Sequence, residues 1–564
     1  MPQSEISTWL QFALQQMAAE SYLDGIDWNN AEQVKTQLRL GNNRPGFPQT
    51  GATRFTGTIS NGLQDQAFVE RYQIVDHHAS DATGFSATLM KDATTNTYTL
   101  SFRSLEYQNQ VDGGDWQRDG LPGAAGEIVG TGFALAQLVS MERYYRELKA
   151  NPLKLPPGAI LNVTGYSLGG HLATVFTQLH ANEIVATYTF NGGGRGGING
   201  GTSGLSETDR IREMLQFAED QILDWDPTGN VFRDGNGGNI YSEQWYEGVR
   251  GQTVFQFRPT SSFLPPGQIG SAPGFEKITQ LVGQATHNDQ SYVANSGIHG
   301  DPTTIFIEDQ PNVDGLGGLF GQSGSFGTTH SITLLVDSLA LMELFQKVDG
   351  TLDQATIEGI FAAASSQTGS GVVGLAGLAE GNSLENALDV LGKILVPNYT
   401  PTPSGRQTND FGNLTFRNQF YTHLQEVKAA LNGQTHQIVS LVNMPVETIK
   451  GHALLPEEAG TAYRYAVKNL NPFVVVGADY TQFHNPGDLD LYDPSTGNGS
   501  ITLEYLKDRT AFLGKKIEVN QANTGGSLSL IYYKDNDSGY EIGLSDAPLS
   551  QMTFGSATDE TING

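Results

Sequence analysis

The sequence contains no cysteine among its 564 residues. Disulfide bridges, thiolate metal sites and cysteine nucleophiles are therefore excluded together. Long apolar runs are also missing, because no stretch reaches the roughly 18 apolar residues that a membrane-spanning helix needs. Residues 1–23 have neither a basic segment nor a long apolar segment, so we expect no cleavable secretory signal. The absence of cysteine fits an exported protein and a cytosolic protein equally.

Positive charge is scarce as well. The chain has 32 Lys and Arg against 60 Asp and Glu, a formal net charge of −28. Such a surface repels nucleic-acid phosphates and anionic membranes, so we expect no nucleic-acid partner. It suits contact with calcium, because hard cations bind carboxylate oxygens. Hydrophobic residues still make up 38% of the chain, enough for packed cores, and the length predicts two or more domains.

Strand and helix patterns alternate through the first part of the chain. Apolar residues recur at helical spacing in some segments and alternate with polar residues in others. We expect, in order, a helix over 5–23, a hairpin over 85–107, a helix over 126–149, a strand over 159–164, a helix over 170–181, a strand over 184–191, a strand over 303–309 and a helix over 331–345. This order is typical of a parallel sheet covered by helices, so we predict an α/β fold.

Two regions depart from this alternation. Residues 198–300 form a long insertion rich in Gly, Asn and aromatic residues. After a Pro- and Thr-rich stretch near residue 400, the chain looks helical over 415–470 and reads as short alternating strands over 473–545. We therefore expect one α/β domain over 1–400 and a mixed, β-rich domain over 401–564.

The segment LNVTGYSLGGHLATVF (161–176) contains the motif Gly165-x-Ser167-x-Gly169. The motif follows an apolar strand and opens a helix, the context in which a serine projects from a strained turn as a nucleophile. Glycines two residues away on either side leave room for that turn. The amide of Leu168, at the helix N-terminus, would stabilise an oxyanion. The alternative interpretation is a tight strand–helix turn without catalytic function.

GYSLGGHLA followed by the strand end TFN resembles the large secreted bacterial lipases and phospholipases of the α/β-hydrolase fold. Upstream, SFRSLEY (101–107) is similar to the F-R-G-T/S oxyanion strand of that group, with Ser104 in place of the usual glycine. The resemblance implies that the backbone of Ser104 or Leu105 supplies the second oxyanion donor beside Leu168. An ordinary core strand is the alternative for SFRSLEY.

Attack by Ser167 needs a base within hydrogen-bond reach, and histidine is the usual choice. In α/β hydrolases the chain order is Ser, then Asp or Glu, then His, so the base should follow residue 167. His330 ends a Gly- and Ser-rich loop and directly precedes an apolar helix. The segment THSITLLVDSLAL (329–341) also resembles the equivalent part of the bacterial lipases. We predict His330 as the base; the alternative is a helix N-terminal residue with no catalytic role.

The acid that orients this imidazole is predicted to be Asp309. It closes the apolar strand TTIFIED (303–309), at the sheet edge where catalytic groups gather in α/β folds. The family shows an acidic residue near a proline at a similar strand end. Asp301, Glu308 and Asp314 are the competing candidates.

Two segments mix glycine with apolar residues at helical spacing, as a mobile lid over a lipid-binding site would. They are residues 263–283 and 371–395. For each, the alternative is a core helix with a loose connection.

Candidate calcium ligands lie near the C-terminus. Asp488, Asp490 and Asp493 form one acidic turn, and Asp535 and Asp537 form another. Neither completes a known calcium loop, and a solvated acidic turn is the alternative. The last residues, ATDETING (557–564), resemble the start of a glycine-rich, calcium-binding nonapeptide array. The whole pattern resembles secreted lipases that carry such repeats and leave the cell without a cleaved signal.

Together these features predict a serine ester hydrolase, a lipase that cleaves long-chain acyl esters such as triacylglycerol through an acyl-enzyme. Calcium is a candidate ligand, but the chemistry itself needs no cofactor. The expected partners are a lipid or acyl-ester substrate and a lipid interface. One alternative is a phospholipase A-type effector acting on membrane lipids. Another is a non-catalytic secreted binding module built on a hydrolase fold.

Overall fold

The computed structural model describes residues 4–42, 53–81, 83–105, 124, 128, 132–200, 206–221, 224–226, 231–233, 257–263, 274–285, 302–307, 330–364, 382–402, 414–456, 458–483, 487–522, 531–542 and 550–555. Its contacts define two compact units. The first unit comprises Met1–Gly283, Ser291–Thr304 and His330–Val336; the second comprises Gln284–Gln290, Ile305–Thr329 and Asp337–Gly564. Residues 337–400 thus belong to the second compact unit, and the division into domains at residue 400 stays a prediction.

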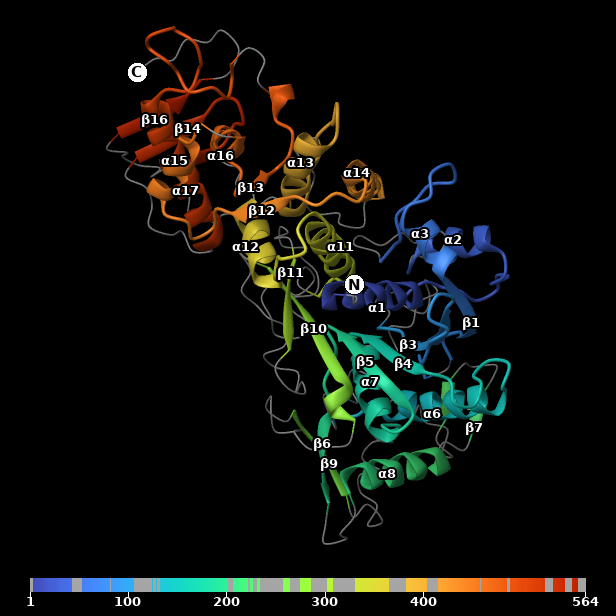
Figure 1. Cartoon of the computed structure of the whole chain (residues 1–564). Helices are drawn as coiled ribbons and strands as arrows, with labels where there is room; N and C mark the ends of the chain where they lie inside the picture. Colours follow the sequence, from blue (N-terminus) through green and yellow to red (C-terminus); the bar gives the residue numbers. More distant parts are fainter. Residues whose placement is uncertain are drawn as a thin grey trace. The chain divides into compact units, whose positions relative to one another are not determined.

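A seven-stranded sheet has the strand order β1-β2-β3-β4-β5-β10-β11 (Figure 1). The β1–β2 and β2–β3 pairs are antiparallel, whereas β3–β4, β4–β5 and β5–β10 are parallel. The strands are β1 (Tyr72–His78), β2 (Ala87–Asp92), β3 (Tyr98–Phe102), β4 (Leu161–Tyr166), β5 (Ile184–Phe190), β10 (Ile278–Ala285) and β11 (Thr303–Ile307). The mixed α/β architecture and the hairpin expected over 85–107, now β2–β3, are therefore confirmed.

Helices of the first unit cover both faces of this sheet (Figure 1). Along β4, Val163 packs in the apolar cluster that includes α7, whereas the next residue, Thr164, donates its hydroxyl to Gln16 Oε1 of α1 at 2.7 Å. Because successive strand residues point to opposite faces, α7 and α1 lie on opposite sides of the sheet. The helices are α1 (Glu5–Ala19), α2 (Ala31–Leu40), α3 (Gln64–Arg71), α6 (Leu135–Ala150), α7 (Leu168–Leu179) and α8 (Glu207–Gln221).

The structure differs from the sequence-based expectation at the start of α6. Helix α6 begins at Leu135, whereas the sequence predicts one continuous helix from residue 126. Ile128 is helical, and the other residues of 126–131 lie outside the described residues. Gly132 has a φ of 84°, which an α-helix does not accommodate, so the predicted helix is interrupted at this glycine.

The predicted insertion over 198–300 contains a strand of the central sheet, β10. β10 pairs in parallel with β5, with Ile278 opposite Thr187 and Leu281 opposite Phe190. The lid expected over 263–283 is therefore wrong for its final residues, which are fixed in the sheet. The other described elements of this region are α8 (Glu207–Gln221), β6 (Gly196–Gly200, which begins two residues before the insertion) paired with β9 (Phe257–Phe263), β7 (Asp224–Asp226) paired with β8 (Val231–Arg233), and the 3₁₀ turn η2 (Phe275–Lys277).

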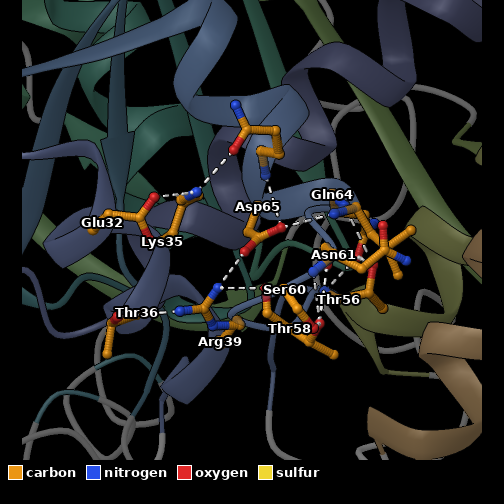
Figure 2. A network of polar contacts seen from close by, with 12 residues as sticks. Glu32, Lys35, Thr36, Arg39, Thr56, Thr58, Ser60, Asn61, Gln64 and Asp65 are labelled. Atoms are coloured by element: carbon orange, nitrogen blue, oxygen red, sulfur yellow. Dashed lines mark hydrogen bonds and ion pairs between the residues drawn. The ribbon is translucent and has the colours of Figure 1, made fainter.

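A buried carboxylate holds α2, α3 and the loop between them (Figure 2). Asp65 accepts a hydrogen bond from Arg39 Nη1 at 2.7 Å and from the amides of Leu63 and Gln66 at 2.9 and 2.8 Å. Its side chain is fully buried, so these donors replace the water that the charge loses on folding.

The second unit is built mainly of helices with short sheets between them. α11 (Ile332–Val348) begins in the first unit and ends in the second. The other elements are α12 (Gln354–Ala364), α13 (Ser383–Leu395), α14 (Leu414–Leu431), α15 (Val446–Ala453), α16 (Glu458–Lys468), α17 (Leu503–Ala522), the antiparallel pair β12 (Gln437–Ser440) and β13 (Phe473–Val476), the turn η4 (Thr481–Phe483), and the sheet β15-β14-β16 made of β14 (Ile531–Asp535), β15 (Glu541–Ile542) and β16 (Ser550–Phe554).

The strand content expected over 473–545 is wrong over 503–522, where the chain forms α17. Leu506, Thr510, Leu513 and Ile517 are buried, and they recur at intervals of three or four residues. That spacing places them on one face of a helix, so the helical period prevails over the local alternation. Residues 383–395 of the second lid candidate form α13, and residues 371–381 lie outside the described residues.

An ion pair inside the second unit joins α14 to α11. Arg417 donates from Nε and Nη2 to the two carboxylate oxygens of Asp337 at 2.9 and 2.7 Å, and Tyr421 donates its hydroxyl to the same carboxylate at 2.8 Å. Arg417 is 1% exposed and Asp337 is 4% exposed. Because both charges are out of water, each depends on the other.

Arg417→Met should lower the free energy of unfolding by about 3–5 kcal/mol, because it leaves the Asp337 carboxylate buried without its cation. Lys347→Met is the matched control, since Lys347 pairs with Glu343 at 2.9 Å on the surface and should cost less than about 1 kcal/mol. Urea denaturation measures both variants. Equal effects would contradict the assignment of the buried pair.

Candidate active site

Ser167 lies in a sharp turn between β4 and α7. Its backbone has a φ of 54° and a ψ of −118°, and its side chain is half exposed. The Ser167 amide donates to the Phe190 carbonyl of β5 at 3.2 Å. Its carbonyl accepts from the amides of Gly170 and Gly193 at 2.9 and 2.7 Å. A non-glycine residue persists in this conformation only where the surrounding structure holds it, as these three bonds do.

Three glycines make the turn sterically feasible. A Cβ on Gly165 would lie 2.1 Å from the Gly169 carbonyl oxygen, and a Cβ on Gly169 would lie 2.2 Å from the Phe102 carbonyl oxygen. A Cβ on Gly170 would lie 2.4 Å from Gly192 Cα. Because these neighbours are backbone atoms, no side-chain rotation can relieve the clash. Each glycine of the motif GYSLGG therefore has a specific steric role.

Helix α7 begins at Leu168, two residues before the start of the helix predicted over 170–181, and Leu168 is therefore its first residue. An α-helix leaves its first N–H groups without an intrahelical acceptor, so the Leu168 amide suits an oxyanion. The Leu168 side chain shares a small apolar cluster with those of Leu105, Ala124 and Ala134. The structure thus brings Leu105 and Leu168, two of the predicted oxyanion residues, close together.

Ser104 is engaged differently from the expectation. Its amide donates to both carboxylate oxygens of Glu20 at 3.2 Å, and its hydroxyl donates to Glu20 Oε2 at 2.5 Å. An amide bound in this way does not serve an oxyanion in the same conformation. The Ser104 amide is therefore not available to an oxyanion in this conformation, and Leu105 as the second donor stays a prediction.

His330 lies beside the residue that precedes Ser167. The Tyr166 hydroxyl donates to the His330 carbonyl oxygen at 2.5 Å, and the two ring centroids are 5.1 Å apart. His330 is 4% exposed, and burial lowers the pKa of its imidazole to about 3. A carboxylate near an imidazole raises its pKa again, which is the effect that a base in an acyl-transfer site requires.

The predicted acid lies outside the described residues. Asp309 follows the last described residue of β11, Ile307, by two positions. The competing residues Asp301, Glu308 and Asp314 are also outside the described residues.

His171 is a structural residue of the site that sequence reasoning did not single out. Its ring is fully buried, its Nδ1 lies 2.8 Å from the Gly194 carbonyl oxygen, and its Nε2 accepts from the Ala134 amide at 3.1 Å. These two bonds require a neutral ring with the proton on Nδ1. His171 thereby joins α7 to the loop before α6 and to the loop after β5.

Glu20 was also missed. It continues the buried face of α1 after Ala13, Gln16 and Met17, at helical spacing. That spacing is the signal that could have placed Glu20 on the buried face of the helix. A buried acidic residue needs hydrogen-bond donors around it, so a polar network at this position could also have been expected.

The acidic turns proposed for calcium have partners within the protein. Asp493 accepts from the Ser495 amide and hydroxyl at 2.8 and 2.7 Å. Asp535 is buried and pairs with Arg509 at 3.0 Å. Among the described residues, no group of three or more His, Asp or Glu side chains is arranged to hold a metal ion. Calcium binding, with Asp488, Asp490 and Asp537 as its other ligands, stays a prediction.

The described helices give no candidate for a membrane span, because none is both long enough and apolar enough. Neither the family models nor the curated proteins compared with the sequence give a match. Among solved structures, the chain is similar to the crystal structure of the Lip2 lipase from Yarrowia lipolytica. The identity is 12% and the TM-score is 0.25, with 54% of this chain and 80% of that chain covered.

His171→Phe should lower the free energy of unfolding by about 2–5 kcal/mol, because the Ala134 N–H and the Gly194 carbonyl lose their partners. Burial lowers the pKa of His171 from 6.5 to about 4, so the unfolded chain binds the proton first. Its contribution to stability is therefore present above pH 6.5 and is lost as the pH falls towards 4.

Urea denaturation across this pH range tests the effect. The His171→Phe variant should show a flatter loss of stability with acid than the wild type. His436→Phe, at a half-exposed histidine, controls for the removal of a histidine as such. Identical pH slopes for the wild type and His171→Phe would be incompatible with the assigned role.

Proposed function

We propose that this chain is a serine ester hydrolase of the α/β-hydrolase type, with Ser167 as its nucleophile. The observation that carries the proposal is the backbone of Ser167, with its φ of 54° between a parallel strand and a helix. Strained residues of this kind cluster at functional sites, where the strain presents a reacting group. The half-exposed side chain and the start of α7 at Leu168 fit this role.

In the proposed reaction, Ser167 Oγ attacks the ester carbonyl carbon while His330 accepts the hydroxyl proton. The amides of Leu168 and Leu105 bind the oxyanion of the tetrahedral intermediate. The ester C–O bond then breaks as His330 returns the proton to the leaving alcohol. Water, deprotonated by His330, hydrolyses the acyl-enzyme and regenerates Ser167.

The substrates we propose are long-chain acyl esters, triacylglycerol first. The support for an acyl chain is the resemblance of the nucleophile motif to lipases, together with the apolar side chains of Leu105 and Leu168, which pack against each other at the two oxyanion donors. A phospholipase A acting on membrane lipids is the second candidate, carried by the family resemblance of the nucleophile motif. Hydrolysis rates on a triacylglycerol and a phospholipid with identical acyl chains distinguish the two. We also propose that the protein is secreted without a cleaved signal, that a glycine-rich calcium-binding array begins near its C-terminus, and that a mobile lid covers the site.

Ser167→Ala should lower kcat for ester hydrolysis by about 10⁴-fold or more, because no other group forms the acyl-enzyme. The wild type should react with a fluorophosphonate at Ser167, and the variant should not. Ser206→Ala, which removes an exposed serine elsewhere in the first unit, should be labelled like the wild type. An unlabelled, inactive wild type would favour the non-catalytic binding module instead.

We propose Asp309 as the acid that orients His330. The position of β10 in the sheet makes Asp289 a further candidate for this role. Asp289 follows Ala285, the last residue of β10, by four positions, and β10 is the strand next to β5 in the sheet. In parallel sheets, catalytic groups gather after the carboxyl ends of the strands.

Asp309→Asn should lower kcat by about 10⁴-fold, because an amide cannot stabilise the imidazolium, while Asp289→Asn should change kcat by less than about tenfold. Both variants are measured with a soluble ester under saturating conditions. The reverse result would transfer the role to Asp289.

A further inference from the structure

Glu20 brings a buried carboxylate to the segment that follows β3. It caps the C-terminus of α1 and is 1% exposed. It accepts two bonds from the Ser104 amide, one from the Ser104 hydroxyl at 2.5 Å and one from Gln16 Nε2 at 2.8 Å. These donors come from α1 and from the segment that was expected to supply an oxyanion donor.

A chain of hydrogen bonds fixes Glu20 relative to the strand that carries Ser167. Gln16 Nε2 also donates to the Phe102 carbonyl of β3 at 2.8 Å, and Gln16 Oε1 accepts from the Thr164 hydroxyl of β4 at 2.7 Å. Gln16 and Thr164 are both fully buried. Because buried side chains have few alternative rotamers, this network holds the end of α1 in one position against β3 and β4.

We propose that Glu20 is a positioning residue of the acyl-transfer site, which directs the Leu105 amide toward the oxyanion by binding the amide and hydroxyl of Ser104. The Ser104 amide is bound to Glu20, so the next amide along the chain, that of Leu105, is the candidate donor of this segment. The Leu105 side chain already packs with that of Leu168, whose amide is the other donor. The inference rests on the proposed ester hydrolysis.

The charge of Glu20 is costly to the fold. Burial raises the pKa of its carboxyl to about 7, while Arg103 and the bonds from Ser104 and Gln16 lower it. Arg103 itself lies over the Tyr22 ring at 4.0 Å. Because the folded pKa exceeds the ordinary value of 4.5, ionised Glu20 destabilises the fold as the pH rises towards 7. A glutamine would fill the same volume without that cost, so stability alone does not account for a carboxylate here.

The test compares Glu20→Gln and Glu20→Asp with the wild type on a water-soluble p-nitrophenyl ester. In Glu20→Gln, one of the two oxygens that accept from Ser104 becomes an uncharged NH₂ group, so kcat should fall by about 10- to 100-fold while KM changes by less than about twofold. Above pH 7, its thermal midpoint should equal or exceed that of the wild type, because the buried charge is gone. Glu20→Asp keeps the carboxylate and should retain more of kcat than Glu20→Gln.

Asp65→Asn is the matched control. Asp65 is likewise a buried carboxylate of the first unit that binds two backbone amides, but it holds the loop between α2 and α3 (Figure 2). This variant should lose thermal stability and keep kcat. If Glu20→Gln does not fold, Ser104→Ala replaces it: the loss of the hydroxyl bond should lower kcat by about 3- to 10-fold.

The outcomes separate this inference from the proposed function. Wild-type kcat in Glu20→Gln, or in Ser104→Ala where that variant replaces it, together with an inactive Ser167→Ala, overturns the inference and leaves the proposed function standing. A Glu20→Gln variant that loses kcat only in step with its thermal midpoint overturns it too, because the role is then purely structural. Full activity in Ser167→Ala overturns the proposed function and the inference together.

Discussion

The backbone of Ser167 depends on three positions that carry no side-chain atoms. With Gly165, Gly169 and Gly170, the chain leaves β4, turns and enters α7 so close to the Phe102 and Gly192 backbones that a Cβ atom at Gly169 or Gly170 would clash with them. The hydrogen bond from the Gly193 amide then ties the segment after β5 to the Ser167 carbonyl. One local conformation thus brings together the ends of three adjacent strands, β3, β4 and β5. The positions of the Ser167 hydroxyl, of the N-terminus of α7 and of the candidate oxyanion segment after β3 all depend on this conformation.

The two faces of the sheet contribute differently to the site. The main apolar cluster lies on the face of α7, where the neutral ring of His171 supplies the bonds that fix two loops. On the face of α1, the core contains buried polar groups, with Thr164, Gln16 and Glu20 in one connected network. Buried polar groups are tolerated only when their hydrogen bonds are made, so this network fixes geometry at a cost in stability. That division is consistent with a site whose precision matters more than its contribution to folding.

The second unit follows a different plan. Its helices pack around aromatic contacts such as Phe345 with Phe361 and Phe473, at centroid distances of 5.2 and 5.4 Å. The Arg417–Asp337 pair and the Arg509–Asp535 pair are both buried, and each joins a helix to a separate element. Pairs of this kind specify one arrangement of helices, because any other arrangement leaves a charge without its partner.

The sequence by itself determined whatever depends on near neighbours in the chain. The motif GYSLGG, the strand before it and the helix after it were readable because a strained turn needs glycines at fixed offsets from Ser167. The hairpin β2–β3 was readable because alternation and a short turn are local as well. Tertiary structure alone decided the partners of distant residues: β10 joins β5 from within a long insertion, and Ser104 binds Glu20, 84 residues away in the chain. Hydrogen bonds between distant segments leave no period or spacing in the sequence, because the fold brings their donors and acceptors together.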